Sequence, residues 1–236
     1  MGEDAQASSG LEPPAYTSRM TTIHDVADPT TKLKITVVSD FICPWCYVGL
    51  EVIDRLWQKY DFELDWAPYF LDPSIPPEGR VRAPTTTPDT PKSDLEKRAE
   101  SEGIELRRGR TFTPHTHMAL QASEWARDQG DARTVLEFHR ALFKRHFTEH
   151  ENLMEPDVLA STATEMGLDG DDLRAALAEG RYKAQVDEGI EHSYAIGVTG
   201  IPTFILNDQY AVVGAQTYDV FERVMAELGV QPRDEA

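Results

Sequence analysis

The chain contains two cysteines, Cys43 and Cys46, and they lie three positions apart in a sequence of 236 residues. Thiols at this spacing can form and break a disulfide with each other, or they can supply half of a metal site. A thiol reacts as its thiolate, so a reactive cysteine needs surroundings that favour negative charge. The local structure around the pair therefore decides which chemistry is open to it.

The flanking residues predict a junction between a buried strand and a helix. Residues 34–40 (KITVVSD) are short, β-branched and apolar on both faces, as expected of a buried strand. Pro44 suits the first turn of a helix, where its missing N–H costs nothing. Cys43 then lies at the helix N-cap, facing free backbone N–H groups and the positive end of the helix dipole. We expect Cys43 to be solvent-facing and acidic, and Cys46 to be less exposed and to resolve mixed disulfides.

The middle of the chain changes from strand to loop to helix. Residues 62–71 (FELDWAPYFL) read as a second strand, after a helix that runs from Pro44 to about residue 61. Residues 73–91 carry Pro and Thr at a density that predicts a loop. From 93 to 197 nearly every segment has helical period and none has strand character.

Strand character returns towards the end of the chain. Residues 202–206 and 210–214 read as two strands joined by a hairpin turn. Thr217 is expected to cap a last helix that ends at Gly229. The order βαβ, helical block, ββα predicts an α/β fold with a large all-helical insertion between two halves.

The charge and hydropathy of the chain exclude several classes of protein. The chain has 41 acidic and 23 basic residues, a formal charge of -18, which would repel a phosphate backbone and argues against nucleic-acid binding. No window reaches the roughly 18 apolar residues of a membrane span. Residues 1–33 lack the apolar run of a secretory signal and are expected to be a disordered tail, with Met20 as an alternative start. We expect a cytoplasmic protein, where a close cysteine pair is more often catalytic or metal-binding than structural.

A zinc site is the competing interpretation of the cysteine pair. A structural zinc site usually takes four ligands, and the chain has no second CxxC. His115 with His117, or His146 with His150, could complete such a site. All four histidines fall in predicted helices far along the chain from Cys43, so the sequence favours a redox pair without a metal.

Three stretches of the chain resemble a known family. They are SDFICPWCYVG (39–49), TGIPTFIL (199–206) and VVGAQ (212–216). They are similar to the DsbA-like thioredoxin-fold proteins, and most of all to the FrnE-like branch of cytoplasmic dithiol/disulfide oxidoreductases. The resemblance covers residues from about 34 to 229. It implies a thioredoxin-like domain made of 34–75 and 198–230, with a Pro-rich loop and helical insertion subdomain over 76–197.

The resemblance also implies roles for individual residues. In the family, the proline at the Pro202 position is cis and faces the CxxC, and the preceding residue, here Ile201, pairs its backbone with a substrate chain. The electrons pass through the cysteines, so no cofactor is needed beyond the redox-active disulfide of Cys43 and Cys46. The implied partners are protein thiols and disulfides, with glutathione or a thioredoxin-type reductant as electron partner.

Three further residues, Asp40, Trp45 and His117, have two interpretations each, and Pro44 acts together with Trp45. Asp40 either tunes the thiol proton or only ends the strand. Trp45 can contact a protein substrate or cover the pocket, and His117 either borders the active-site groove or is a polar group at a helix start. The Pro44-Trp45 dipeptide places no imidazolium between the thiols, which predicts milder thiolate stabilisation than in the strongest oxidants of the fold.

Two other functions remain open at this point. Isomerases and glutathione transferases of the same fold use a single Ser or Cys with glutathione, whereas this chain has a complete pair; a redox-independent chaperone is the third possibility. Some FrnE-like proteins have a second cysteine pair that this chain lacks. We also expect the helical block to overhang the CxxC and to form a substrate groove.

Overall fold

The computed structural model describes residues 32–84, 86–87 and 89–233. The tail expected over 1–33 lies outside the described residues except for Lys32 and Leu33. Leu33 is buried, and its carbonyl accepts a hydrogen bond from the Glu63 N–H at 2.7 Å. Leu33 therefore lies at the start of the sheet.

A four-stranded sheet with the order β2-β1-β5-β6 forms the centre of the α/β fold. Strand β1 (Lys34–Ser39) pairs in parallel with β2 (Glu63–Pro68) and antiparallel with β5 (Thr203–Leu206), which pairs antiparallel with β6 (Tyr210–Val213). Helix α1 (Pro44–Lys59) connects β1 to β2. The strand order and directions confirm the predicted thioredoxin-like arrangement of βαβ and ββα halves.

The hairpin between β5 and β6 has the expected turn. Asn207 and Asp208 both have positive φ, 48° and 57°, as a type I′ turn requires. Thr217 directly precedes the last helix, α8 (Tyr218–Glu227), but its side chain makes no capping hydrogen bond. Thr217 is thus the N-cap residue, as predicted, but its hydroxyl pairs with the Asp219 carboxylate and not with a backbone N–H of the first turn.

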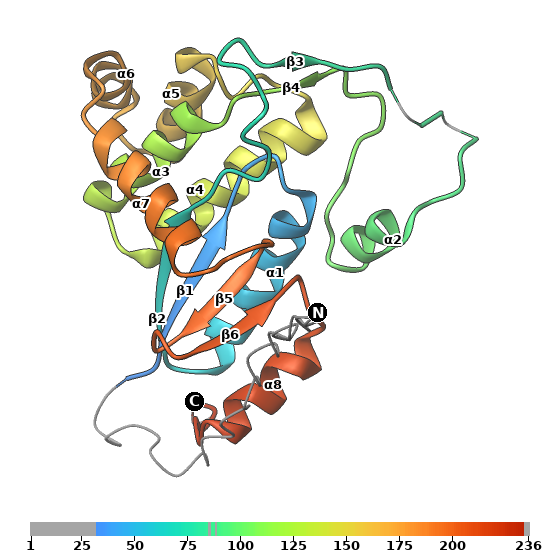
Figure 1. Cartoon of the computed structure of the whole chain (residues 1–236), viewed down its shortest axis with the longest axis vertical. Helices are drawn as coiled ribbons and strands as arrows, with labels where there is room; N and C mark the ends of the chain where they lie inside the picture. The colour runs from blue at the N-terminus through green and yellow to red at the C-terminus, as the bar shows by residue number, and fades with distance from the viewer. Residues whose placement is uncertain (1–31, 85, 88, 234–236) are drawn as a thin grey trace, which may run out of the picture. The chain divides into compact units, whose positions relative to one another are not determined.

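The insertion is helical and lies mostly beyond one end of the sheet. Figure 1 shows the arrow of β1 pointing towards helices α3 to α6, whereas α2 lies away from these helices, on the side of α1. The helical elements of the insertion are α2 (Asp94–Ser101), α3 (His117–Gln129), α4 (Ala132–Lys144), the π-helical turn η1 (Arg145–Glu149), α5 (Pro156–Glu165), α6 (Gly170–Glu179) and α7 (Lys183–Ala195).

Two short strands correct the prediction of a loop over 73–91 and of no strand after 93. Strand β3 (Arg80–Val81) pairs antiparallel with β4 (Phe112–Thr113). Each strand has two residues, too few for a period of alternating side chains to be visible in the sequence. The Phe112 ring lies where a Cβ on Gly79 would be, 2.2 Å from the nearest ring carbon, so the close approach depends on glycine.

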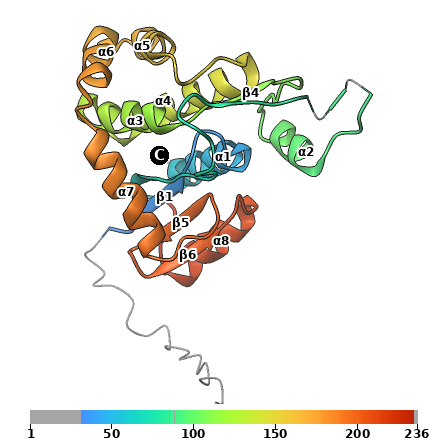
Figure 2. The ribbon, with the colours of Figure 1, turned by 45° about the horizontal axis from the view of Figure 1, so that its top comes forward.

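The insertion packs directly against the thioredoxin-like half. The buried apolar side chains form one continuous cluster that includes β1, α1, α3 and α4. The Tyr47 ring of α1 stacks on the Phe143 ring of α4 at 5.3 Å between centroids. Figure 2 shows α7 running along one side of the sheet, and a Cβ on its Gly189 would lie 2.6 Å from the ring of Pro68 in β2. Among the described residues, no helix is long and apolar enough to cross a membrane.

Candidate active site

The CxxC motif lies at the junction of β1 and α1, as its flanking residues predict. Cys43 is the N-cap residue of α1 and has extended backbone, with Pro44 at the first helical position. The Cys43 N–H donates to the Asp40 carbonyl at 3.0 Å, and the Cys46 N–H donates to the Cys43 carbonyl at 3.1 Å. These bonds hold the turn that brings the two side chains to the same end of the helix.

Both cysteines are free thiols and both are buried, with 2% of Cys43 and 3% of Cys46 exposed. The expectation of a solvent-facing Cys43 is therefore wrong. An isolated helix start would expose this residue, but the loop before β5 lies across it. The Cys43 thiol donates to the Ile201 carbonyl at 3.6 Å. Trp45, between the cysteines, is exposed.

The environments of the two thiols shift their pKa values in opposite directions. The Cys46 thiol donates a hydrogen bond to the Cys43 sulfur, and this bond and the nearby N–H groups of Cys46 and Trp45 lower the pKa of Cys43 against the opposing effects of burial and of Asp40. Burial, and then the bond to Cys43, raise the pKa of Cys46 well above its ordinary value. The Ser39 hydroxyl partly offsets this rise. Cys43 is thus the more acidic of the two, in the direction that the helix positions predict.

Pro202 lies against the helix that carries the cysteines. The Ile201–Pro202 peptide bond is cis, which confirms the prediction for this bond. A Cβ on Gly49 of α1 would lie 3.0 Å from the Pro202 Cγ and 3.1 Å from the Phe204 Cζ. Glycine at position 49 therefore allows α1 to approach the loop that holds Ile201 and Pro202.

Asp40 is a buried carboxylate three residues before Cys43, with 1% of its surface exposed. Burial raises its pKa to about 6, although hydrogen-bond donors oppose the shift. Among these donors are the Leu71 N–H at 2.8 Å, the Thr116 hydroxyl at 2.7 Å and the Ile42 N–H at 3.3 Å. Asp40 therefore connects the end of β1 to the loop after β2 and to the residue that precedes α3.

His117 lies at the start of α3, and both of its ring nitrogens have partners in the insertion. Nε2 lies 2.9 Å from an Asp187 oxygen of α7, and Nδ1 lies 2.9 Å from the Gln121 side-chain nitrogen. The ring is also 5.9 Å from that of Phe70, between centroids. Among the described residues, no hydrogen bond joins His117 to either thiol.

The histidines considered as zinc ligands lie apart from the cysteines. The His146 Nε2 pairs with Arg110, and the His150 Nε2 with the Arg107 carbonyl. Within 32–84, 86–87 and 89–233, no group of three or more His, Cys, Asp and Glu side chains is arranged to hold a metal ion.

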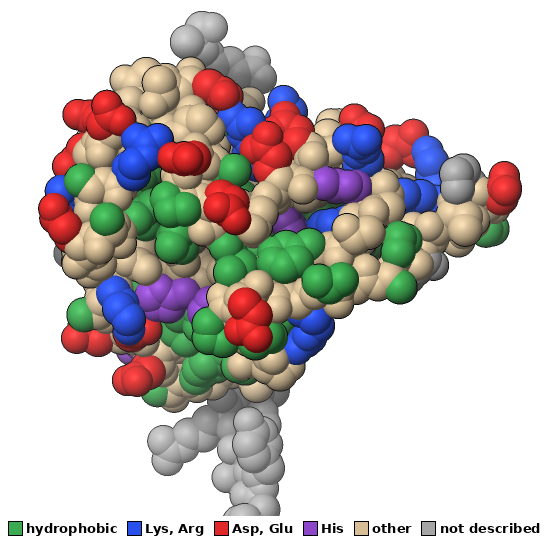
Figure 3. All heavy atoms as spheres, turned by 90° about the horizontal axis from the view of Figure 1, so that it is seen from above, with side chains coloured by type: hydrophobic (Ala, Val, Ile, Leu, Met, Phe, Trp, Pro, Cys, Tyr) green, Lys and Arg blue, Asp and Glu red, His purple; other side chains and the backbone are tan. Residues whose placement is uncertain are grey.

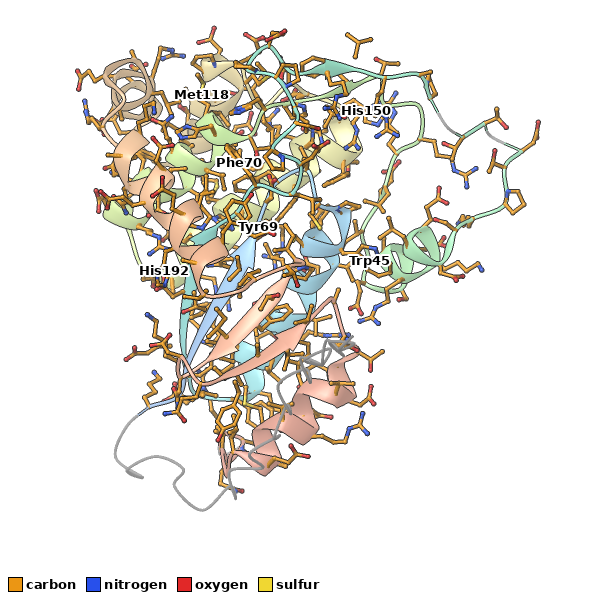
Figure 4. All side chains as sticks on the ribbon, in the orientation of Figure 1. Trp45, Tyr69, Phe70, Met118, His150 and His192 are labelled. Carbon is orange, nitrogen blue, oxygen red and sulfur yellow. The ribbon has the colours of Figure 1, made fainter. Side chains whose placement is uncertain are left out.

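Apolar side chains are exposed around the insertion and the sheet. Figure 3 shows hydrophobic side chains gathered across the middle of the face seen from above, bordered by charged ones. Figure 4 places Trp45 at the start of α1, and Tyr69 and Phe70 between the sheet and the helices. The Tyr194 hydroxyl of α7 donates to the Phe70 carbonyl at 2.6 Å, which fixes this half-exposed ring beside the loop that follows β2.

The fold and the paired thiols define a thioredoxin-like protein with a helical insertion. The family model described as a DSBA-like thioredoxin domain matches residues 34–226, and the chain belongs to this family. The YwbO protein of Bacillus subtilis (strain 168), described as uncharacterized, is 29% identical over 200 residues, which cover 83% of this chain and 96% of YwbO.

Two solved structures have the same fold. The probable DsbA oxidoreductase SCO1869 of Streptomyces coelicolor has a TM-score of 0.70 at 24% identity, covering 86% of this chain and 93% of its own. The cytosolic disulfide reductase DsbM of Pseudomonas aeruginosa, solved with GSH, has a TM-score of 0.57 at 14% identity, covering 82% of this chain and 98% of its own.

Two polar groups of the site, one beside Cys46 and one on Asp40, were not found from the sequence. Ser39 ends β1 beside Cys46, and Thr116 reaches Asp40 across 76 positions of chain. Ser39 directly precedes Asp40, so the end of a buried strand beside the CxxC is a signal that could have marked it. Thr116 carries no such signal, because only the packing of the insertion on β1 brings it to Asp40.

Proposed function

We propose that the protein is a thiol–disulfide oxidoreductase acting on protein thiols through its CPWC motif, of the disulfide isomerase or reductase type. The observation that carries the proposal is the pair of free thiols at the start of α1, with the Cys43 thiol in contact with the Ile201 carbonyl next to Pro202. The opposite directions of their pKa shifts agree with it. A two-cysteine cycle needs one thiol that ionises readily and a second that keeps its proton until the first has reacted.

The proposed cycle begins with Cys43. Its thiolate attacks a client disulfide, forming a mixed disulfide and expelling one client sulfur as a thiolate, which takes up a proton. Cys46 then loses its proton and attacks the Cys43 sulfur. The Cys43–Cys46 disulfide forms, the second client sulfur leaves as a thiolate, and the client has gained two electrons. The reverse sequence oxidises a client dithiol.

The neighbouring residues have supporting roles in this proposal. Ile201 offers its backbone to a client strand. When the Cys43 thiol ionises, it no longer donates a hydrogen bond to the Ile201 carbonyl, and this carbonyl becomes free to pair with the client. Trp45 and Pro44 contact the client at the exposed start of α1, and Pro202 lies beside the sulfur under attack. Asp40 tunes the pair, because its negative charge raises the pKa of Cys43.

We assign His117 to the wall of the substrate groove and not to proton transfer. Both of its nitrogens are engaged by Asp187 and Gln121, so its role is to hold α3 against α7 next to Phe70. The insertion is then the part of the molecule that selects clients.

The electron partner we propose is glutathione or a thioredoxin-type reductant. DsbM, with which this chain shares the fold, was solved with GSH. A place in the FrnE-like branch and in the cytoplasm completes the proposal. No cofactor is required, since both electrons reside in the cysteine pair. The complete pair also separates this chain from the glutathione-dependent isomerases, which use a single Ser or Cys.

Reduction of insulin by dithiothreitol tests the proposal. The wild-type protein should accelerate the appearance of insoluble B chain, and Cys43→Ser should abolish the acceleration. A protein that prevents insulin aggregation without accelerating reduction would be a chaperone, and the redox proposal would be lost. Conjugation of glutathione to aromatic substrates by the wild type would favour the transferase alternative.

A further inference from the structure

A group of basic side chains that have no ion-pair partner among the residues the structure describes lies where the β3–β4 hairpin meets η1. Arg82, Arg107 and Arg110 make no salt bridge with any described residue, whereas every other arginine of the described part lies within 4.0 Å of a carboxylate oxygen. In a chain of formal charge -18, carboxylates are abundant. Three neighbouring arginines without a carboxylate partner among the described residues therefore distinguish this part of the surface.

Arg110 is held by contacts that do not compensate its charge. Its Nη1 lies 2.6 Å from the His146 Nε2, and its guanidinium carbon lies 4.9 Å from the centroid of the Phe147 ring. Its Nε is buried and has no hydrogen-bond partner within the described part of the chain. A half-buried guanidinium in a folded protein usually has a carboxylate beside it, since burying an unpaired charge is unfavourable.

His146 cannot supply that compensation. It is 1% exposed, and burial together with the Arg110 charge lowers the pKa of His146 well below its ordinary value. The imidazole is thus neutral and accepts a hydrogen bond from Arg110. Burial and the nearby Arg82 lower the pKa of Arg110 to about 10, so the guanidinium still carries its charge at neutral pH.

Arg82 is brought to the same place by the hairpin. Its N–H donates to the Thr111 carbonyl at 2.8 Å, next to Arg110 in the chain. The Arg107 N–H donates to the Phe147 carbonyl at 3.0 Å, and its own carbonyl contacts His150. Figure 4 shows His150 near β4, on the same side of the molecule as Trp45. The basic group therefore belongs to the part of the insertion that faces α1.

A chain of aromatic contacts connects the basic group to the CxxC helix. Phe147, which lies under Arg110, stacks with Tyr47 at 6.3 Å between centroids, and Tyr47 directly follows Cys46. Arg110 thus lies on the part of the insertion that packs against the helix carrying the cysteine pair.

We infer that Arg110 and Arg82 bind a carboxylate group of the disulfide substrate. This inference rests on the proposed oxidoreductase function and names the class of substrate for it. A carboxylate matches the planar fork of a guanidinium and would give Arg110 the charge partner that it lacks among the described residues. A small thiol such as glutathione and an acidic side chain of a client protein both present this chemistry.

Two aromatic disulfides of similar size test the inference with the full-length protein. Dithiobis(nitrobenzoate) carries carboxylates and dithiodipyridine does not. Both react by thiolate attack, which forms a mixed disulfide and releases one aromatic thiolate; attack by the second cysteine releases the other. Arg110→Gln should slow the reaction with the anionic disulfide roughly tenfold, with little change for the neutral one. Arg82→Gln should show the same preference if Arg110→Gln fails to fold.

Arg223→Gln is the matched control, because it removes the same charge from an exposed position on α8. It should leave the ratio of the two rates unchanged. An unchanged ratio in both Arg110→Gln and Arg82→Gln would overturn the inference. The redox proposal would survive that result, since in this assay it fails when the wild type releases no second aromatic thiolate from either disulfide.

The source of the carboxylate is tested with two further pairs of substrates. Glutathione disulfide is compared with its ethyl ester, and a disulfide-linked peptide containing Glu with the same peptide containing Gln. Loss of rate in Arg110→Gln confined to glutathione disulfide assigns the carboxylate to the small thiol, and loss confined to the Glu peptide assigns it to a client protein. No loss with either would count against the inference in the same way as an unchanged ratio.

Discussion

The reactivity of the two thiols is set by their immediate neighbours. Cys43 receives a hydrogen bond from Cys46 and from the free N–H groups of the first helical turn, whereas Cys46 is surrounded by the core. We expect Cys46→Ser to accumulate mixed disulfides with client proteins and Cys43→Ser to accumulate none, because only the first variant keeps the attacking thiolate. Non-reducing gels of the purified variants measure this. Faster alkylation of Cys46 than of Cys43 by iodoacetamide at neutral pH would reverse the assignment.

Asp40 makes the stability of the reduced protein depend on pH. Burial raises its pKa from 3.8 to about 6, so the folded state binds the proton more tightly than the unfolded state does. This stabilisation is complete below about pH 4 and is lost as the pH rises through about 6. A shift of about two units corresponds to about 3 kcal/mol. Between about pH 4 and pH 7, wild type should therefore lose about 3 kcal/mol relative to Asp40→Asn, whose side chain does not titrate.

Urea unfolding at a series of pH values measures the difference between wild type and Asp40→Asn. Thr116→Val provides a matched variant, because loss of the hydroxyl donor to Asp40 should move the titration to higher pH. Asp40→Asn should also lower the pKa of Cys43, since the charge of Asp40 raises it. A difference in free energy of unfolding that stays constant with pH would show that Asp40 ionises normally in the folded state.

The sequence predicts these residues better than it predicts their surroundings. Pro44 and the apolar spacing after it place Cys43 at a helix start, which is local information. Cys43 is covered by Ile201, which lies 158 positions later in the chain. The hydroxyl that donates to Asp40 belongs to Thr116 in the insertion. Burial of Cys43 and the raised pKa of Asp40 are therefore consequences of tertiary packing that no local pattern contains.

At the scale of elements, one glycine allows α7 to lie against β2. A Cβ on Gly189 would lie 2.6 Å from the Pro68 Cγ and 3.0 Å from its Cδ, and a proline ring cannot rotate away. Gly189→Ala should therefore destabilise the protein by about 1–2 kcal/mol, even though alanine favours a helix by about 1 kcal/mol over glycine. Glu188→Ala, exposed on the same helix, should change the free energy of unfolding by less than about 0.5 kcal/mol. A Gly189→Ala protein as stable as wild type in urea would mean that α7 is free to shift.

The order of the long elements was predictable for a physical reason, and the shortest ones were not. Strands β1 and β5 are β-branched and apolar, and the long helices repeat their apolar residues every three or four positions. Strands β3 and β4 instead pair residues about 30 positions apart in the chain, and the Phe112 ring packs closely over Gly79. The basic group at Arg82 and Arg110, which this hairpin brings together, could not be predicted from the sequence for the same reason.

At the scale of the molecule, the continuous core decides how the chain unfolds. The division into a thioredoxin-like domain and an insertion subdomain over 76–197 is a prediction from the order of elements. Yet the Phe143 ring of α4 contacts both Phe41, at 5.1 Å, and Tyr47, at 5.3 Å between centroids. Unfolding the insertion alone would expose α1 and the cysteine pair to water, at a cost proportional to the apolar area uncovered.

We therefore expect the thioredoxin-like half and the insertion to unfold in one cooperative transition. A buried tryptophan in each of them can report it. Trp66 lies in β2 and Trp125 in α3, with 5% and 0% exposed. In variants that keep only one of the two, with the other tryptophans changed to Phe, the urea midpoint from fluorescence should equal the midpoint from far-ultraviolet circular dichroism of the same variant. Comparison within each variant removes the effect of the substitutions themselves. In the variant that keeps Trp125, a fluorescence midpoint at lower urea than the circular-dichroism midpoint would instead identify the insertion as a separate folding unit, able to open while the sheet stays folded.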